Sequence, residues 1–270
     1  MLKTAFDLVS VPPFPEKPRE SGITMTIDYG LGAAAQQDLI ESGGWFIDLS
    51  KIATGVSRVL PGELLKKKIQ AYREGLIKPF PGGQFFELAY LQKKVEPFFE
   101  AVAGAGYTHV EISDNCIDLP PADKIRAIRQ ARKQGLIVLG EVGKKNAKSD
   151  SRHLAADIQR SLEAGAWKVL VEAMELFDGG LDAALVESVS RAVPLEKLIF
   201  ETPSTWMKGV DFHAQYDLWK WLLANLGPEV NIGNVPPEQA VRLACLRLGV
   251  GSDPTLEKGA FILSRRGLLG

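Results

Sequence analysis

Short apolar runs alternate with amphipathic stretches along the whole chain. The apolar runs are continuous rather than alternating in polarity, which is typical of parallel strands covered on both faces. They predict eight strands, over residues 23–28, 45–51, 76–80, 107–113, 136–142, 167–172, 197–201 and 230–234. Each run is followed by a stretch whose apolar residues have helical spacing, and the last of these ends near residue 248.

Eight strand–helix units in this order predict an α/β protein with a (β/α)8 TIM barrel. Gly106, Gly135 and Gly165 each precede a predicted strand, where the glycine that ends a helix is expected. The rival architecture is a doubly wound open sheet, which would carry a phosphate-binding loop after its first strand. The segment Asp28-Tyr-Gly-Leu-Gly32 has only part of the GxGxxG spacing, so the barrel is favoured.

Composition narrows the class of protein. Of the 270 residues, 46% are hydrophobic and 24% charged, which indicates a globular rather than a disordered chain. The net charge of −1 gives no general attraction to nucleic acid or to an anionic membrane. No apolar stretch reaches the ~18 residues of a membrane span, and Cys116 and Cys245 are the only cysteines. We therefore expect a cytoplasmic protein without a nucleic-acid or membrane partner. We divide it into an N-terminal arm (1–20), a barrel (21–251) and a C-terminal extension (252–270).

Acidic side chains stand at the predicted strand ends. The active site of a (β/α)8 barrel lies at the carboxyl ends of its strands. Glutamate recurs at four successive ends although it is disfavoured in strands, and these residues are Glu111, Glu141, Glu172 and Glu201. Carboxylates gathered at one mouth repel one another, so a cation must offset them. Sites rich in carboxylate oxygen suit Mg²⁺, which we expect these glutamates to bind; salt bridges between neighbouring strand ends are the alternative.

Lysines provide the candidate catalytic groups. Lys51 ends the second predicted strand, and Lys144 and Lys145 follow the fifth. A lysine at a barrel mouth can bind a phosphate or carboxylate, protonate a carbanion or form a Schiff base. Adjacent residues rarely both point into one site, so we expect one of Lys144 and Lys145 to lie inside it and the other outside.

The helix predicted over 211–226 has more apolar residues than one core-facing stripe needs. They are Phe212, Tyr216, Leu218, Trp219, Trp221 and Leu222. An apolar excess on an outer barrel helix indicates a subunit interface, so we expect a homo-oligomer. The alternative is a thick contact with the Pro-rich arm.

A series of motifs occurs in order between residues 17 and 255. They are Lys17-Pro-Arg-Glu-Ser-Gly-Ile-Thr-Met-Thr-Ile-Asp28, Asp48-Leu-Ser-Lys51, Pro81-Gly-Gly83 with Glu87, Val110-Glu-Ile-Ser-Asp114, Glu141-Val-Gly-Lys-Lys145, Glu163-Ala-Gly-Ala166 and Asn231-Ile-Gly-Asn234. This series resembles the phosphosulfolactate synthase family of coenzyme M biosynthesis. The resemblance implies a (β/α)8 barrel that uses Mg²⁺ to add sulfite to phosphoenolpyruvate, giving (2R)-phospho-3-sulfolactate.

The resemblance also implies roles for individual residues. A lysine of the Glu-Val-Gly-Lys-Lys motif would deliver a proton to C2 of the substrate, with Lys144 as the first choice and Lys145 as the second. Lys51 would contact the phosphate or carboxylate of the substrate. The alternative is that the two roles are exchanged and Lys51 delivers the proton. The motif residues expected to bind substrate are Asp28, Ser113, Asn231, Gly233 and Asn234.

Several positions depart from the family pattern. Tyr29 stands where a lysine often follows the first-strand aspartate, and Asn115-Cys116 stands where a glycine usually follows Ile-Ser-Asp. In the late Gly-Leu-Arg-Gly-Asp-Thr pattern the arginine is replaced by Gly251, which would remove a fork of donors for an anionic substrate. Two other hypotheses therefore stay open: a related barrel acting on another phosphorylated or carboxylate acid, and a catalytically silent, stress-related barrel. Retention of the strand-end charges argues against the silent barrel, because burying them costs desolvation energy.

Overall fold

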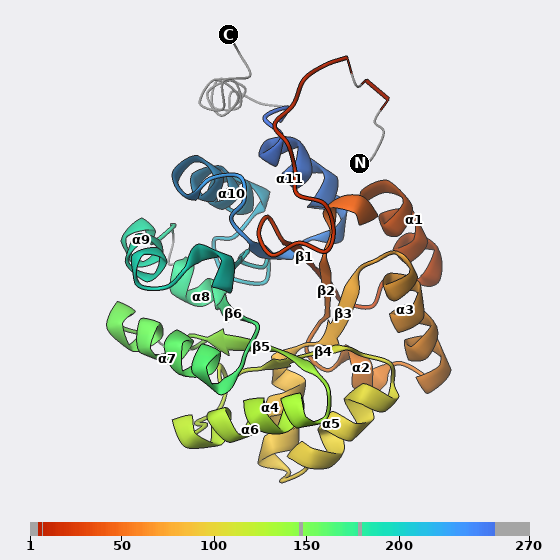
Figure 1. The fold of residues 1–270 in the computed structure, drawn as a ribbon, viewed down its shortest axis with the longest axis vertical. Helices are drawn as coiled ribbons and strands as arrows, with labels where there is room; N and C mark the ends of the chain where they lie inside the picture. The colour runs from red at the N-terminus through yellow and green to blue at the C-terminus, as the bar shows by residue number, and fades with distance from the viewer. Residues whose placement is uncertain (1–4, 7, 146–147, 178–179, 252–270) are drawn as a thin grey trace.

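Eight strands alternate with helices in the computed structural model, which describes residues 5–6, 8–145, 148–177 and 180–251 (Figure 1). The strands are β1 (Thr24–Asp28), β2 (Leu49–Ile52), β3 (Lys78–Pro81), β4 (His109–Ile112), β5 (Ile137–Val142), β6 (Lys168–Val171), β7 (Leu198–Glu201) and β8 (Ile232–Val235). The helices are α1 (Ala33–Gly43), α2 (Val56–Val59), α3 (Gly62–Glu74), α4 (Gly83–Leu91), α5 (Val95–Gly104), α6 (Pro121–Lys133), α7 (Ser151–Ala164), α8 (Ala173–Leu176), α9 (Ala183–Ala192), α10 (Phe212–Leu226) and α11 (Ala240–Arg247). Three short 3₁₀ helices cover Gly44–Phe46, Leu195–Lys197 and Pro237–Gln239.

The strands form a nearly closed parallel barrel. Their order is β3-β2-β1-β8-β7-β6-β5-β4, so β1 pairs with both β2 and β8. β3 and β4 lie beside each other and bring the two edges together, but no hydrogen-bonded ladder joins them in the described chain. The predicted (β/α)8 barrel is thereby confirmed over the open sheet. Two helices, α4 and α5, stand between β3 and β4, and they are separated at Lys93, whose φ is +55°.

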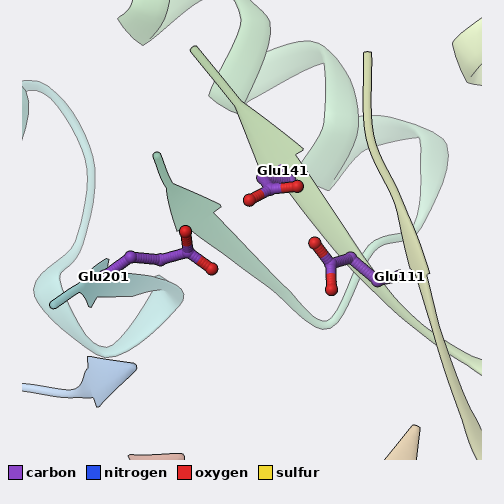
Figure 2. Close-up of side chains that lie close together, drawn as sticks. All are labelled: Glu111, Glu141 and Glu201. Atoms are coloured by element: carbon purple, nitrogen blue, oxygen red, sulfur yellow. The ribbon is translucent and has the colours of Figure 1, made fainter. Parts of the chain in front are cut away.

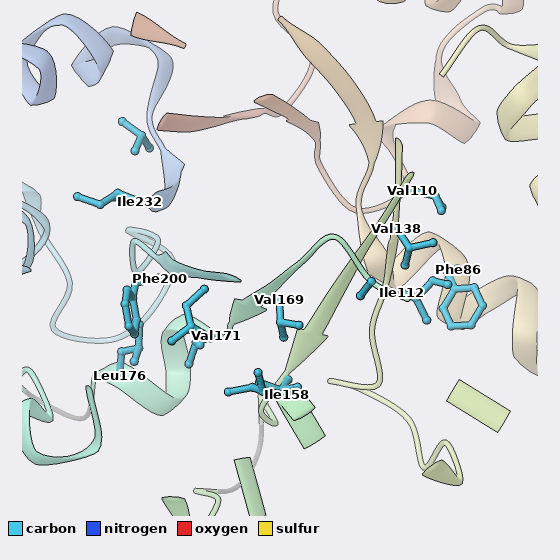
Figure 3. Packing of buried hydrophobic residues seen from close by; sticks show 14 of the residues in the cluster. Phe86, Val110, Ile112, Val138, Ile158, Val169, Val171, Leu176, Phe200 and Ile232 are labelled. Carbon is cyan, nitrogen blue, oxygen red and sulfur yellow. The ribbon is translucent and has the colours of Figure 1, made fainter. Parts of the chain in front are cut away.

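The outward side chains of the strands pack against the surrounding helices. Val110 on β4 and Val138 on β5 face this layer, as Figure 3 shows, and Phe86 of α4 and Ile158 of α7 belong to the same buried cluster. Each fully buried side chain of this size contributes about 1.5–3 kcal/mol relative to exposure. This layer is the main hydrophobic core, and it fixes the strand ends that carry the site.

The inward side chains follow the period of two that a strand imposes. Leu139 and Ile199 belong to a separate apolar cluster inside the barrel. Glu141 and Glu201 come two residues later on the same strands, so their side chains also point inward. On β2, Leu49 and Lys51 have the same relation. The alternation on β2, β5 and β7 therefore brings charged side chains onto the inner face at the carboxyl end.

The N-terminal arm packs across the amino end of the barrel. Lys17 donates to the backbone oxygens of Gly44 (2.7 Å) and Leu76 (3.0 Å). Arg19 pairs with buried Asp48 just before β2, at 2.9 Å. At the other side of the ring, Lys168 of β6 donates to the backbone oxygen of Glu20 at 2.8 Å. The arm thus covers the end opposite to the strand termini that carry the glutamates. The predicted extension, 252–270, lies outside the described residues.

Helix α10 uses its apolar residues within the chain. Tyr216, Leu218, Trp219 and Leu222 are buried in the main core, and Phe212 and Trp221 are half-buried against it. The surface excess that suggested a subunit interface is therefore absent from this helix, and the homo-oligomer stays a prediction. Among the described residues, no helix combines the length and apolar character needed to cross a membrane.

Candidate active site

Three buried glutamates converge on one lysine at the carboxyl end of the barrel. Glu111 of β4, Glu141 of β5 and Glu201 of β7 point toward one another, as Figure 2 shows, with carboxylate oxygens within 4.8 Å of each other. The Lys51 ammonium lies 2.6 Å from Glu201 Oε1, 3.1 Å from Glu111 Oε1 and 3.8 Å from Glu141 Oε1. The structure therefore brings together four residues that the sequence predicted for the site.

Burial and mutual repulsion control the protonation of this group. Burial raises the pKa of Glu111 well above its usual range, and repulsion from Glu141 adds to the rise. Burial raises the pKa of Glu201 to about 8, against the attraction of Lys51. For Glu141, burial is outweighed by the attraction of Lys51, so its pKa falls to about 2. Burial is likewise outweighed for Lys51, because the three carboxyl groups raise its pKa and keep it charged.

The same three carboxyl groups fit a divalent cation. The second oxygen of Glu111, Oε2, is buried without a hydrogen-bond partner and is available as a ligand. Carboxylate oxygens are the ligands that Mg²⁺ prefers, and a bound cation would replace the protons that burial favours on Glu111 and Glu201. Glu172, the fourth predicted ligand, is not part of this triad and binds other partners.

A second lysine lies in the pocket beside the triad. Lys145 lines the same pocket as Lys51 and the glutamates, and its Nζ lies 3.6 Å from Glu172 Oε2. The ammonium also lies 6.0 Å from the ring centre of Trp206, which is largely exposed at the pocket edge. Burial would lower the pKa of Lys145, but attraction to Glu172 and Glu141 outweighs it and raises this pKa. Lys145 is therefore a protonated amine inside the site.

Lys144 has a different setting. Its Nζ contacts the backbone oxygen of Asp114, the Asp114 carboxylate at 3.1 Å and the backbone oxygen of Ile117 at 3.0 Å. Its backbone N–H donates to Glu175 Oε1 at 3.0 Å. Lys144 is absent from the described pocket lining, so it holds the loop after β5 while Lys145 points inward. One lysine inside and one outside is the arrangement that the sequence predicted, but Lys145 lines the pocket and not Lys144, which was the first choice.

Two predicted substrate-binding residues are engaged outside the pocket. Asp28 Oδ2 accepts hydrogen bonds from Lys68 and Tyr72 of α3, because Asp28 points to the outside of β1. Asn231 precedes β8 at the amino end of the barrel, where its amide accepts from Ile23 N (2.9 Å) and donates to Leu198 O (2.8 Å). Their side chains hold the barrel wall together at places away from the described pocket lining.

The other three residues lie closer to the site. Asn234 lines the pocket, and its Oδ1 is buried without a partner. Its φ of +50° interrupts the alternation on β8, a conformation that asparagine tolerates better than most residues. Gly233 faces the interior, where a Cβ would lie 2.6 Å from Met25 Cε. Ser113 donates to Glu87 Oε1 at 2.5 Å and so joins the end of β4 to helix α4 next to the pocket.

Sequence reasoning missed several residues of the pocket wall. Thr54 and Trp206 line it from the loops after β2 and β7, and Gly83 lines it from the start of α4. A Cβ on Gly83 would lie 2.5 Å from Ser113 Oγ and 2.9 Å from Glu111 Oε1, so only glycine lets α4 start this close to β4. The Pro81-Gly-Gly83 motif was the available signal for Gly83, whereas a lone exposed tryptophan gives none.

An acidic pocket with two lysines at the carboxyl ends of parallel barrel strands defines a (β/α)8-barrel enzyme. Residues 12–253 match the family model described as (2R)-phospho-3-sulfolactate synthase (ComA). The chain belongs to this family, as the sequence motifs predicted.

Two curated relatives agree with this assignment. The phosphosulfolactate synthase of Methanothermobacter thermautotrophicus is 33% identical over 92% of this chain and 96% of its own length. The phosphosulfolactate synthase of Methanocaldococcus jannaschii is 31% identical over 87% of this chain and 94% of its own length. Among solved structures, 2,3-dimethylmalate lyase, a member of the PEP mutase/isocitrate lyase superfamily, has a TM-score of 0.51. It is 12% identical and covers 92% of this chain and 81% of its own, so it supports the fold alone.

Proposed function

We propose that this protein catalyses the Mg²⁺-dependent addition of sulfite to phosphoenolpyruvate, giving (2R)-phospho-3-sulfolactate. The observation that carries the proposal is the convergence of Glu111, Glu141 and Glu201 on one side of a pocket that also contains the Lys145 ammonium. The reaction needs stabilisation of developing negative charge and a proton donor close to it. The three glutamates meet the first requirement through the cation that they would hold, and the Lys145 ammonium meets the second.

The reaction is an addition without a leaving group. The lone pair of the sulfite sulfur forms a carbon–sulfur bond to C3, the methylene carbon of phosphoenolpyruvate. The π electrons of the C2–C3 bond move toward C2 and the carboxylate as an enolate, and one proton then adds to C2. The phosphate ester is retained throughout, so the enzyme must hold the anion, stabilise the enolate and place the proton on one face.

Residues of this chain can be assigned to these tasks. Lys145 is the proton donor, because its ammonium lies in the pocket beside the carboxyl groups. Lys51 contacts an anionic group of the substrate as a point charge. Glu111, Glu141 and Glu201 would hold Mg²⁺, which when bound stabilises the negative charge of the enolate.

The direct test is an assay with phosphoenolpyruvate, sulfite and Mg²⁺, scored by mass spectrometry for phosphosulfolactate. We expect product that depends on all three additions. The matched control is Glu201→Gln, which keeps the size of the side chain but removes a charged ligand. A folded wild-type protein that forms no phosphosulfolactate at saturating substrate would contradict the proposal.

A second candidate is a reaction with another phosphorylated or carboxylate acid. It is favoured by the described pocket lining, in which both cations are lysines and no arginine occurs. Gly251 packs against Leu246 and is likewise not part of this lining. A panel of 2-phospho and 2-keto acids with sulfite, screened in the same assay, separates this candidate from the first. The buried charges of the pocket argue against the silent barrel, because they cost desolvation energy that a purely structural role would not require.

A further inference from the structure

Asn115 contacts three different elements around the pocket. It is buried in the loop between β4 and α6. Its backbone N–H donates to Glu87 Oε1 of α4 at 2.7 Å, and its backbone oxygen accepts from the N–H of Lys145 at 3.2 Å. Its side-chain Nδ2 donates to Glu172 Oε2 at 2.6 Å. One residue thus joins the loops that follow β4, β5 and β6.

The Glu172 carboxylate is held from both sides. Its Oε1 accepts from the backbone N–H of Met174 at 3.3 Å. Its Oε2 accepts from Asn115 Nδ2 and lies 3.6 Å from Lys145 Nζ. Because the orientation of this carboxylate is fixed by Asn115, the position of the lysine ammonium that pairs with it is fixed as well.

The orientation of the Asn115 amide follows from its neighbours. A carboxylate only accepts hydrogen bonds, so the NH₂ group of the amide must face Glu172. The opposite atom, Oδ1, is buried without a partner. The buried Glu87 carboxylate holds the main chain of the same loop, because it also accepts from Ser113 Oγ (2.5 Å) and from Cys116 N (3.2 Å). Asn115 therefore has a fixed main chain and a side chain whose single donor contact is Glu172.

We propose that Asn115 is a positioning residue that sets the place of Lys145, holding its main chain directly and its ammonium through Glu172. This inference rests on the proposed function, in which Lys145 delivers the proton to C2. Asn115 touches neither substrate nor reacting atoms in this scheme. Its effect falls on the proton-transfer step, because misplacing a reacting group by about 1 Å can cost ~10²-fold in rate.

The first test compares steady-state kinetics of Asn115→Ala and Asn115→Asp. The alanine removes the Nδ2 donor, and the aspartate keeps the shape but presents an acceptor to Glu172. We expect both to lower kcat by about tenfold or more while KM for phosphoenolpyruvate stays within about twofold. Cys116→Ser is the matched control, because this neighbouring side chain is exposed, a hydroxyl can still accept from Gln84, and the backbone bond to Glu87 is retained. If kcat of both folded variants stays near the wild-type value, the inference is overturned.

The second test asks whether Asn115 acts through Lys145. In a Lys145→Met background, Asn115→Ala should change kcat by less than about twofold, because two residues that act on one step are not additive. A further tenfold loss in that background would show that Asn115 acts on something else, and would equally overturn the inference.

A third measurement does not depend on turnover. Limiting acetylation followed by mass spectrometry gives the modification rate of each lysine. We expect Lys145 to react several-fold faster in Asn115→Ala than in the wild type, with exposed Lys66 as the internal reference. If the wild type forms no phosphosulfolactate, the proposed function fails and this rate still decides the inference. An unchanged Lys145 rate would refute it.

Discussion

Replacing Lys51 by methionine tests the charge balance of the barrel mouth. The Lys51 side chain is 7% exposed, and its two nearest partners, Glu201 and Glu111, are 2% and 1% exposed. Lys51→Met keeps an unbranched side chain of similar length but leaves three buried carboxyl groups without their cation. Removing one partner of a buried ion pair typically costs about 3–5 kcal/mol. For a chain of this size the melting temperature should therefore fall by about 6–20 °C.

The loss should also depend on pH. With Lys51 present, burial is outweighed by the attraction of the ammonium, and the pKa of Glu141 falls to about 2. Without Lys51 the burial remains, so the folded pKa of Glu141 should rise above the usual 4.5. A carboxyl group whose pKa is raised on folding contributes stability that is complete below its unfolded pKa and is lost as the pH rises through the folded one. The variant should lose this contribution above about pH 5 while the wild type does not, so the difference in melting temperature should grow from about pH 5 to about pH 8.

The assay is thermal unfolding followed by circular dichroism at both pH values, with and without millimolar Mg²⁺. Mg²⁺ should restore part of the lost stability of Lys51→Met, because a ligand that binds only the folded state stabilises it. Lys66→Met is the control, since Lys66 and its partner Glu63 are exposed and this change should leave the melting temperature unaltered. A pH-independent loss that Mg²⁺ does not reduce would refute the reasoning.

Three further changes separate catalytic, metal-binding and structural roles. Lys145→Met should lower kcat by ~10²–10⁴-fold, as expected for a lost general acid. Lys144→Met removes contacts outside the pocket, so it should keep kcat and lower only the melting temperature. Equal losses of kcat in steady-state kinetics would contradict this assignment. Glu201→Gln should weaken Mn²⁺ binding, measured by calorimetry, by at least about tenfold, because a charged ligand of the triad is lost. An unchanged affinity would place the metal elsewhere. Asn231→Ala should reduce the free energy of unfolding in urea by about 1–3 kcal/mol and leave KM unaltered, because the hydrogen bonds of its side-chain amide lie at the amino end of the barrel. A raised KM would return Asn231 to the substrate site.

The architecture could be predicted because local pattern and global fold agree. Continuous apolar runs followed by amphipathic helices indicate parallel strands, and eight such units indicate a barrel. The recurrence of glutamate at strand ends correctly indicated the convergence of Glu111, Glu141 and Glu201. Boundaries were less accurate, because β2 begins at Leu49, after a 3₁₀ turn over Gly44–Phe46 that carries apolar residues of its own.

The direction of individual side chains was harder to predict. Asp28 stands at a strand end like Lys51, but it lies an odd number of residues after inward-facing Met25 and so points outward to Lys68. Applying the period of two to each strand would have found this difference. The choice between Lys144 and Lys145 had no such signal, because both lie in a loop whose path depends on contacts with Asn115 and Glu175.

The missing ladder between β3 and β4 gives the barrel a seam. Elsewhere around the ring, adjacent strands of the described chain share backbone hydrogen bonds. Between β3 and β4 the connection is made by Glu87 of α4, which accepts hydrogen bonds from Ser113 and Asn115 beyond β4. Gly83 and Glu111 line the pocket from the two sides of this seam. A local opening at the seam would break no ladder, so we expect it to require less free energy than an opening between any two paired strands. At each of the other seven junctions of the described chain, the same opening would first have to break backbone hydrogen bonds between strands.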